Sequence, residues 1–305
     1  MTRELPVWRS LMYCPVNVEK YVDRAHTRGA DVIQLDLEDS VPMAEKAGAR
    51  KLVEKAAARV RRGGADVVVR FNQPLSMAVR DIEHAICPDV DALACTKIGG
   101  VSHVQLLDEL VSELEEKRGV PVGRTKFIVM VETAAAFFRM RDIVSASPRI
   151  VAFNLGGEDF ALDNNMQPTG EALLYPKQQM IFAANAAGVI PLGFIDSIAG
   201  FGDWEAFRKM VRRSRDFGFM GAGCIHPGQV AIVNQEYTPG DAEVAYAQKL
   251  IKLDDEAAAS GRGSFTLDGK MVDVPIIVRA RKLIARYEAI KKRESRTLAA
   301  MEYRA

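Results

Sequence analysis

Cysteine is scarce in this sequence, and no two cysteines stand in the CxxC spacing of redox or zinc-binding motifs. Three of the four lie within or beside apolar runs that have the composition of buried strands. We therefore expect small buried side chains in a reducing compartment rather than disulfides or metal ligands. The four cysteines are Cys14, Cys87, Cys95 and Cys224.

An excess of charge of either sign is also missing. The 305 residues include 41 Lys and Arg and 40 Asp and Glu, so the formal net charge is +1. A protein that binds nucleic acid normally carries a clustered basic excess, and this near balance argues against nucleic acid as a partner. A small anionic ligand needs only a few well-placed cations, so such a ligand stays open.

Long hydrophobic runs are absent as well. No window approaches the ~20 apolar residues that a helix needs to cross a bilayer. The first ten residues, MTRELPVWRS, contain no apolar segment of the kind found in secretory signals. We therefore expect no association with a membrane, and a cytoplasmic enzyme or binding protein.

The sequence does contain a regular alternation of short apolar runs with longer amphipathic segments. Segments 104–117 and 204–217, for example, repeat apolar residues at helical spacing. Strands that alternate with helices form parallel sheets, and eight such runs favour a closed (β/α)8 TIM barrel, an α/β fold. An open doubly wound sheet is the rival, but CPVN follows the first run where that fold has a glycine fingerprint. The runs are 10–14, 32–37, 67–71, 92–97, 126–131, 150–155, 189–194 and 221–225.

The pattern changes after the eighth run. We expect the catalytic barrel to occupy residues 1–253 and a C-terminal lid or appendage to occupy residues 254–305. Residues 254–263 are small, acidic and flexible in composition. A short hairpin is expected over 264–274, with Asp-Gly as its turn signal, and a basic helix over 275–293.

Polar and charged residues stand where the expected strands end. In a barrel, chemistry gathers at the C-terminal ends of the strands. Three acidic clusters, an arginine and a lysine at one mouth suggest a site for a hard cation and an anionic substrate. The residues are Tyr13, Asp36, Glu38, Asp39, Arg70, Asn72, Lys97, Glu132, Glu158, Asp159 and His226.

Among the acids, Glu132 and Asp159 end neighbouring strands and could share a metal ion. Mg²⁺ takes one or two carboxylates and completes its octahedron with water and substrate oxygens. The glycines at 156 and 157 would let backbone and substrate approach closely. For the others, Glu38, Asp39 and Glu158, helix capping or support of the site stays as open as direct function.

Arg70 lies inside the apolar run VVVRFN, where an unpaired cation is costly. We expect its guanidinium to grip a substrate carboxylate with two parallel hydrogen bonds. A structural ion pair with Asp36 or Glu38 is the alternative. Lys97 is equally compatible with a solvated strand end and with a role in the site.

Seven segments in order carry a resemblance to a known family. They are RSLMYCPVN, VIQLDLEDSVP, VVVRFN, VMVET, GGEDFALD, IHPGQV and KMVDVP, and they span Arg9 to about Arg286. The chain resembles the HpcH/HpaI aldolase/citrate lyase β-subunit family, and within it most looks like the CoA-ester lyases that act on malyl-CoA and citramalyl-CoA.

The resemblance implies a barrel that is usually trimeric, with Mg²⁺ held by Glu132 and Asp159. It implies that Arg70 contacts the carboxylate or keto oxygen of the substrate, that Glu132 also takes part in binding the substrate, and that Glu158 orients the site. It also implies roles for residues outside the strand ends. Tyr13, Lys20 and Arg24 match positions that bind CoA, and Asp273 matches an aspartate that acts as general acid/base from a neighbouring subunit.

We therefore expect Mg²⁺-dependent cleavage, or formation, of a 3-hydroxyacyl-CoA such as malyl-CoA or citramalyl-CoA, with acetyl-CoA and an α-keto acid as the other partners. One alternative is a citrate lyase β subunit that acts on a thioester of an acyl-carrier protein. A CoA-independent metal aldolase and a non-catalytic binding protein remain as further alternatives.

Overall fold

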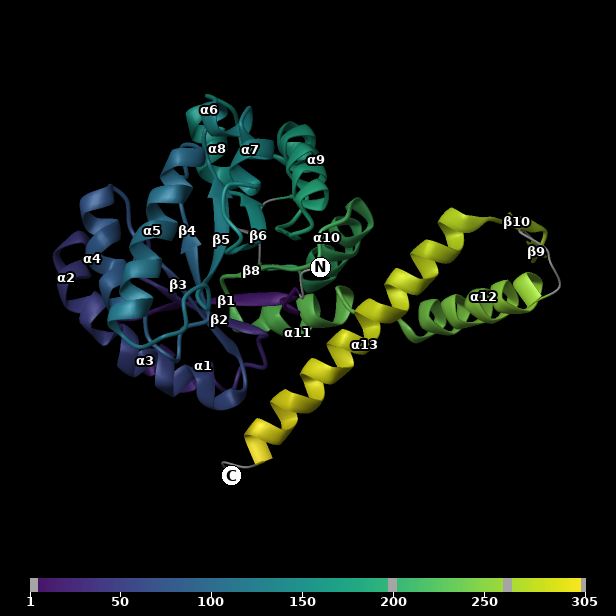
Figure 1. Ribbon diagram of the computed structural model, residues 1–305, viewed down its shortest axis with the longest axis horizontal. Helices are drawn as coiled ribbons and strands as arrows, with labels where there is room; N and C mark the ends of the chain where they lie inside the picture. Colours follow the sequence, from purple (N-terminus) through teal and green to yellow (C-terminus); the bar gives the residue numbers. More distant parts are fainter. Residues whose placement is uncertain (1–4, 197–201, 260–264, 303–305) are drawn as a thin grey trace. The chain divides into compact units, whose positions relative to one another are not determined.

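Eight short strands form a parallel sheet whose order follows the chain (Figure 1). The computed structural model describes residues 5–196, 202–259 and 265–302. Each strand coincides with one of the expected apolar runs, to within a few residues at its ends. The strands are β1 Ser10–Pro15, β2 Val32–Asp36, β3 Asp66–Arg70, β4 Ala92–Cys95, β5 Lys126–Val131, β6 Ile150–Leu155, β7 Ile190–Leu192 and β8 Ala222–Cys224.

The sheet closes on itself. Its order is β7-β6-β5-β4-β3-β2-β1-β8, and a parallel bridge between Leu192 and Gly221 joins the two ends. The amide of Gly193 donates to the carbonyl oxygen of Gly221 at 2.8 Å across the same seam. This closure confirms the (β/α)8 barrel and excludes the open doubly wound sheet.

Alternate residues of the strands face two different cores. Side chains such as Leu11, Val68 and Ile128 pack together inside the barrel with Trp8. Their neighbours in the chain, such as Val67 and Phe127, belong to the larger core between the barrel and its helices. The strands are therefore buried on both faces, which is why they read as continuous apolar runs.

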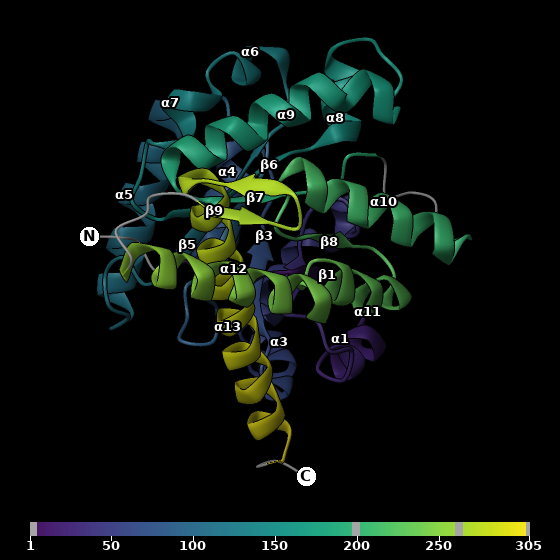
Figure 2. The same cartoon turned by 90° about the vertical axis from the view of Figure 1, so that its right-hand side faces the viewer.

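Helices surround the strands of the barrel (Figure 2). Two of them end at glycines with left-handed backbone, Gly188 with φ 66° and Gly218 with φ 111°, a common helix terminator. The helices are α1 Glu19–Ala25, α2 Lys46–Ala49, α3 Val53–Val60, α4 Leu75–Ala85, α5 Val101–Lys117, α6 Ala134–Phe137, α7 Met140–Val144, α8 Gly157–Asp163, α9 Gly170–Ala187, α10 Trp204–Phe217 and α11 Pro227–Glu236. Short 3₁₀ turns lie at Met43–Glu45, Arg50–Leu52 and Arg61–Gly63.

A second compact unit follows the barrel, over Thr238–Ala299, while Met1–Tyr237 and Ala300–Ala305 form the first. The second unit contains helix α12 (Asp241–Ala259), strands β9 (Phe265–Leu267) and β10 (Lys270–Val272), and most of helix α13 (Val274–Glu302). The hairpin turn is made by Asp268 and Gly269, with φ 50° and 75°, as the Asp-Gly signal predicts. Buried residues of both helices and both strands, among them Leu250, Leu267, Val272 and Ile277, form its own core.

The expected boundary after residue 253 falls inside α12. Residues 254–259, expected to be flexible, are helical, because alanine and glutamate are strong helix formers. Arg281 of α13 also pairs with Asp254 and Asp255 at 3.1 and 2.9 Å. Residues 260–263 of the expected linker, and Ser264 of the hairpin, lie outside the described residues.

All four cysteines are buried and free, as expected from their apolar surroundings. Among the described helices, none is both long enough and apolar enough to pass through a bilayer.

The backbone just before β1 leaves no room for a side chain at Gly221, the residue that precedes β8. A Cβ atom there would lie 1.9 Å from the carbonyl oxygen of Trp8, and backbone cannot move aside as a side chain can. We expect Gly221→Ala to destabilise the protein by about 3 kcal/mol, at the upper end of overpacking effects. Urea unfolding checks this value.

Gly48→Ala is the matched control. Gly48 is an exposed helical residue with nothing within 4 Å of a Cβ atom, so alanine should leave stability unchanged or slightly raise it. Equal urea midpoints for the two variants would show that the backbone around Gly221 tolerates a side chain.

Candidate active site

A cavity of about 870 Å³ opens among the C-terminal ends of the strands. Ligand pockets of barrels lie at this end. Eight of the residues that stand at the expected strand ends line this cavity. They are Tyr13, Asp36, Asp39, Arg70, Glu132, Glu158, Asp159 and His226.

Glu132 directly follows β5 and is almost completely buried, with 3% of its surface exposed. Its Oε2 accepts a hydrogen bond from the amide of Lys97, after β4. A Cβ atom on Gly156 would lie 2.6 Å from Cγ of Glu132, so only glycine lets the backbone after β6 pass this carboxylate.

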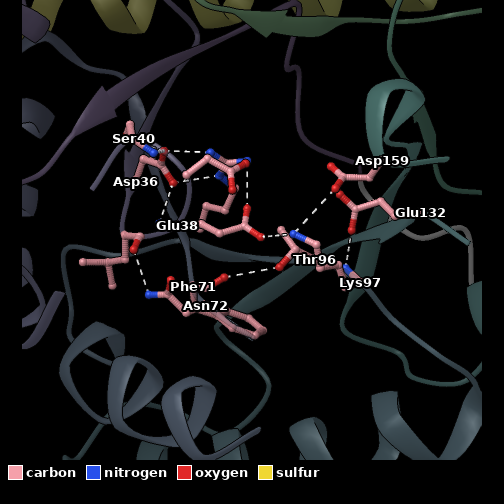
Figure 3. Close-up of polar contacts among 12 residues, drawn as sticks. Asp36, Glu38, Ser40, Phe71, Asn72, Thr96, Lys97, Glu132 and Asp159 are labelled. Carbon is pink, nitrogen blue, oxygen red and sulfur yellow. Dashed lines mark hydrogen bonds and ion pairs between the residues drawn. The ribbon is translucent and has the colours of Figure 1, made fainter. Parts of the chain in front are cut away.

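Asp159 lies in the first turn of α8, and 42% of its side chain is exposed. Figure 3 shows the carboxylates of Asp159 and Glu132 side by side, with Lys97 below them. Nζ of Lys97 lies 3.9 Å from Oδ1 of Asp159. Burial raises the pKa of Glu132 to about 7, and the charges of Asp159 and Glu38 add to the rise. The positive charge of Lys97 therefore does not fully offset the negative charges of the carboxylates around Glu132.

These two carboxylates fit Mg²⁺, which binds one or two carboxylates and keeps its other positions for water and substrate oxygens. Across residues 5–196, 202–259 and 265–302, no three His, Cys, Asp or Glu side chains converge into a complete protein-made metal site. A like-charged pair with one buried and one half-exposed member is suited to a cation that must also meet a substrate.

Arg70, the last residue of β3, is held by Asp36, the last residue of β2. Nε and Nη2 of Arg70 donate to the two carboxylate oxygens of Asp36, both at 2.7 Å. Nη1 lies 2.9 Å from Glu38 and 3.1 Å from Asp39. The structural ion pair that the sequence left as an alternative is thus present. It occupies the Nε–Nη2 edge of the guanidinium, one of the two edges that can bind a carboxylate through two parallel hydrogen bonds.

This pairing dominates the charges of both partners. Burial alone would raise the pKa of Asp36, but the hydrogen bonds and charge of Arg70 hold it below its usual value. Burial alone would lower the pKa of Arg70, but the hydrogen bonds and charge of Asp36 raise it. Both groups are therefore ionised at any physiological pH.

Glu38 connects Arg70 to Lys97. Its carboxylate lies 2.9 Å from Nη1 of Arg70 and accepts a hydrogen bond from Nζ of Lys97 at 2.7 Å. Lys97 has φ 50°, a left-handed conformation that is costly for a residue with a side chain. The sequence left the role of Lys97 open, because a lysine at a strand end is often simply solvated.

Tyr13 on β1 lies against Arg70, with the guanidinium carbon 4.9 Å from the ring centroid. Lys20 and Arg24 are exposed on α1 and are not among the residues that line the cavity. Nζ of Lys20 lies 5.2 Å from the ring of Tyr21, which does line it, as does Arg28 after the helix.

Sequence reasoning missed Lys177, because it lies on helix α9 and not at a strand end. It lines the cavity and is buried, and its Nζ donates to the backbone oxygen of Asp196 at 3.2 Å. Burial lowers the pKa of Lys177 to about 8, although the charges of Asp196 and Glu158 oppose the change. Glu158, in the first turn of α8, is itself exposed.

Asp273 belongs to the second unit, where it directly precedes α13 and is exposed. Its backbone oxygen accepts hydrogen bonds from the amides of Ile276 and Ile277, at 3.1 and 3.3 Å. This is the position of a helix N-cap, and an exposed carboxylate there is free to serve a further role.

Comparisons with known proteins agree with this architecture. The family model described as HpcH/HpaI aldolase/citrate lyase matches residues 9–227. The chain is 32% identical to the citrate lyase subunit beta of Leuconostoc mesenteroides subsp. cremoris, over 90% of this chain and 92% of that protein. It is 31% identical to an L-malyl-CoA/beta-methylmalyl-CoA lyase of Cereibacter sphaeroides, over 92% of this chain and 95% of that protein.

Among solved structures, the protein CitE of Mycobacterium tuberculosis, in complex with magnesium, acetoacetate and coenzyme A, has the same fold. The TM-score is 0.70 at 24% identity, and the match covers 94% of this chain and all of that one.

The raised pKa of Glu132 predicts a stability that depends on pH. The pKa of a glutamate in an unfolded chain is about 4.3, whereas that of Glu132 in the folded protein is about 7. Without divalent cations, the wild type should therefore lose stability as pH rises between these values, because the folded state disfavours the ionised form. Glu132→Gln removes this loss and should be more stable than the wild type at pH 8 by about 2–3 kcal/mol.

Urea unfolding at pH 5 and pH 8 measures the difference. The control is Glu113→Gln on the surface of α5, where the carboxylate is 58% exposed and the change should depend little on pH. If the stabilities of the two glutamine variants depend on pH in the same way, the pKa of Glu132 is not raised in the folded protein.

Proposed function

We propose that this chain, which belongs to the HpcH/HpaI aldolase/citrate lyase family, is a carbon–carbon lyase for CoA thioesters that uses Mg²⁺. Its substrate is a 3-hydroxyacyl-CoA of the malyl-CoA or citramalyl-CoA type, which it cleaves to acetyl-CoA and an α-keto acid or forms from them. The names of the relatives support lyase chemistry on thioesters. The four buried free cysteines support a cytoplasmic location.

The observation that carries the proposal is the pair of carboxylates, Glu132 and Asp159, at the wall of a cavity at the mouth of the barrel. We assign these two residues to Mg²⁺. When bound, the ion would supply Lewis-acid stabilisation to the alkoxide that develops from the substrate hydroxyl. The magnesium in the related CitE structure supports this assignment.

We assign to Arg70, Glu38 and Lys97, which are linked to one another beside the two carboxylates, the positioning of the carboxylates and of the substrate. Glu38 is anchored by Arg70 and by Lys97, and the amide of Lys97 fixes one oxygen of Glu132. Arg70 gives two of its five N–H groups to Asp36 and directs Nη1 at Glu38 and Asp39. We assign its remaining donor capacity to an oxygen of the substrate acid, with Asp39 and Glu158 as supports at the rim.

For the thioester itself we assign Tyr13, Lys20 and Arg24 to the CoA moiety. Tyr13 lines the cavity, and Lys20 lies beside Tyr21, which also lines it. Two exposed cations on α1 suit the phosphates of CoA, which stay near solvent while the acyl group enters the cavity.

Cleavage also needs proton transfers. The substrate hydroxyl loses its proton, the carbon–carbon bond breaks, and the electron pair passes to the thioester enolate, whose carbon must then gain a proton. We assign Asp273 as the general acid/base, acting in the cavity of a neighbouring subunit of a homotrimer. Its exposure at the start of α13 supports a carboxylate available to a partner.

A second function is favoured by the 32% identity with a citrate lyase subunit beta. In that case the thioester is carried by an acyl-carrier protein, and the cations of α1 have no CoA to bind. Turnover of free CoA thioesters by the purified chain separates the two functions. A CoA-independent aldolase would instead cleave hydroxy acids without any thioester.

The proposed reaction is tested with a panel of malyl-, citramalyl- and β-methylmalyl-CoA, with release of keto acid as the readout. Wild type should turn over at least one of them with Mg²⁺ and lose activity in a chelator. Glu132→Ala and Asp159→Ala should each lose at least a hundredfold in kcat/KM, since one carboxylate leaves too weak a site for the ion. In each variant the rise in thermal midpoint that Mg²⁺ causes in the wild type should also disappear. A variant that keeps both the activity and this rise would exclude its residue from the metal site.

Asp273→Asn should bind CoA thioester as well as the wild type but turn it over at least a hundredfold more slowly, because the amide keeps a helix cap and cannot transfer a proton. Mixed with Glu132→Ala subunits and allowed to exchange, it should regain part of the activity, since some cavities then receive an intact residue of each kind. Full activity of Asp273→Asn alone would reduce this residue to a cap, and mixtures with no gain would place both residues in one subunit.

A further inference from the structure

The carbonyl oxygen of the thioester has no partner in the reaction described above. In cleavage, the electron pair of the broken carbon–carbon bond passes into the thioester, and this oxygen becomes the oxygen of an enolate. The proton that the hydroxyl releases is returned to the enolate carbon, so the thioester product is neutral. The carboxylates assigned to Mg²⁺ and the guanidinium of Arg70 serve the acid, at the other end of the broken bond. A hydrogen-bond donor for the enolate oxygen would therefore come from another residue of the cavity.

Asn154, on strand β6, lines the cavity and is partly buried. Ala152, two residues earlier, packs inside the barrel, so the alternation of side chains along a strand directs Asn154 to the same interior. Its side-chain amide forms no hydrogen bond within the part of the chain that the structure describes. An amide in such a place lowers stability unless a ligand or water accepts from it, so a ligand is a physical reason for its presence.

The oxygen and the nitrogen of this amide face different ways. A Cβ atom on Gly193, directly after β7, would lie 3.3 Å from Oδ1 of Asn154 and 2.9 Å from the ring of Phe219. The oxygen therefore lies against the backbone after β7. Nδ2 is bonded to the same carbon, points to the opposite side and carries two N–H donors. These uncharged donors suit an oxygen that gains negative charge only during the reaction.

The amide also lies deeper in the barrel than the carboxylates assigned to Mg²⁺. Asn154 pairs in register with Met130 of β5, and Glu132 follows Met130 by two residues. At about 3.3 Å per residue, Asn154 is about 7 Å nearer the interior of the barrel than Glu132. The oxygen and the sulfur of a thioester point in different directions from the carbonyl carbon. A substrate whose acid lies at the carboxylates and whose CoA leaves toward solvent thus directs its carbonyl oxygen to the depth of Asn154.

We propose that Asn154 is a catalytic residue whose side-chain amide donates a hydrogen bond to the carbonyl oxygen of the thioester and stabilises the enolate formed in cleavage. This inference rests on the proposed function, because it concerns the thioester of that reaction. It applies equally to malyl-CoA and citramalyl-CoA, which carry the same thioester group. A bond that is stronger in the transition state than in the bound substrate raises kcat more than it lowers KM.

Asn154→Leu removes both donors at similar volume. It should lower kcat for cleavage about a hundredfold, the effect typical of losing one donor to an oxyanion, and change KM less than about threefold. Asn154→Ala, which is too small to clash, should show the same loss. Asn154→Asp should be slower still near neutral pH, because its negative charge repels the enolate. Exchange of the methyl hydrogens of acetyl-CoA with deuterium, followed by NMR in D₂O with Mg²⁺, should slow in the same order, since exchange passes through the same enolate.

Binding without turnover tests the same contact. Acetyl-CoA contains the carbonyl oxygen, and the thioether ethyl-CoA lacks it. Calorimetric titration of the full-length protein should give wild type about three- to tenfold tighter binding of acetyl-CoA, as expected for one neutral hydrogen bond. Asn154→Leu should bring the two affinities together by weakening acetyl-CoA alone.

Two controls separate this role from a structural one. Asn154→Leu should keep or raise the urea midpoint, because it breaks no hydrogen bond of the described residues and places an apolar group in a partly buried site. Asn185→Leu removes an exposed asparagine of α9 and should leave kcat and both affinities unchanged.

The two sets of measurements distinguish failure of the inference from failure of the proposed reaction. If wild type cleaves no thioester, the proposed reaction fails, while the affinities for acetyl-CoA and ethyl-CoA still decide the contact. If wild type is active and both Asn154→Leu and Asn154→Ala keep its kcat, the reaction stands and the role of Asn154 is rejected. Equal affinities of wild type for acetyl-CoA and ethyl-CoA, or variants that lose activity through KM alone, would also overturn the proposal.

Discussion

Strands β2 and β3 end in opposite charges, and the register of the sheet makes those two residues, Asp36 and Arg70, direct partners. Their double hydrogen bond fixes the guanidinium so that Nη1 points to Glu38. Glu38 in turn holds Nζ of Lys97, whose backbone amide binds Glu132. The direction of each charged group at this side of the mouth therefore depends on one ion pair between neighbouring strands (Figure 3).

Asp36 and Glu132 show how environment separates two carboxylates that are equally buried. Hydrogen bonds and charge from Arg70 overcome burial at Asp36, whose pKa is lowered. Burial of Glu132 is opposed by the amide and charge of Lys97, but Asp159 and Glu38 repel its charge, so its pKa rises to about 7. A divalent cation would relieve the second carboxylate and do little for the first. The protein thus satisfies the carboxylate that orients the site and leaves unsatisfied the one that can receive a metal.

Much of the fold was predictable because strands buried on both faces leave continuous apolar runs and their ends lie at one edge. The same rule placed Glu132 and Asp159 at a common cavity. It could not decide between a paired and a substrate-gripping Arg70, since strand ends give proximity and not partners. The rule did not identify Lys177, because this residue reaches the cavity from helix α9 and not from the end of a strand. The prediction that residues 254–259 are flexible was wrong, because the alanines and glutamate of this segment also favour a helix.

The strands of the barrel are not paired equally well around its circumference. Strands β7 and β8 have three residues each, and their seam is carried by one bridge and the bonds beside it, whereas β1 to β6 share longer ladders. Short ladders open locally at lower free energy, so amide hydrogens at the seam should exchange with solvent sooner than those of β5. The linked charged residues Asp36, Arg70, Lys97 and Glu132 stand at or just after the ends of β2, β3, β4 and β5, away from the seam. The strands that carry the ion pairs of the mouth are therefore the firmly paired ones, and local opening between β7 and β8 can proceed without separating Arg70 from Asp36 or Lys97 from Glu38.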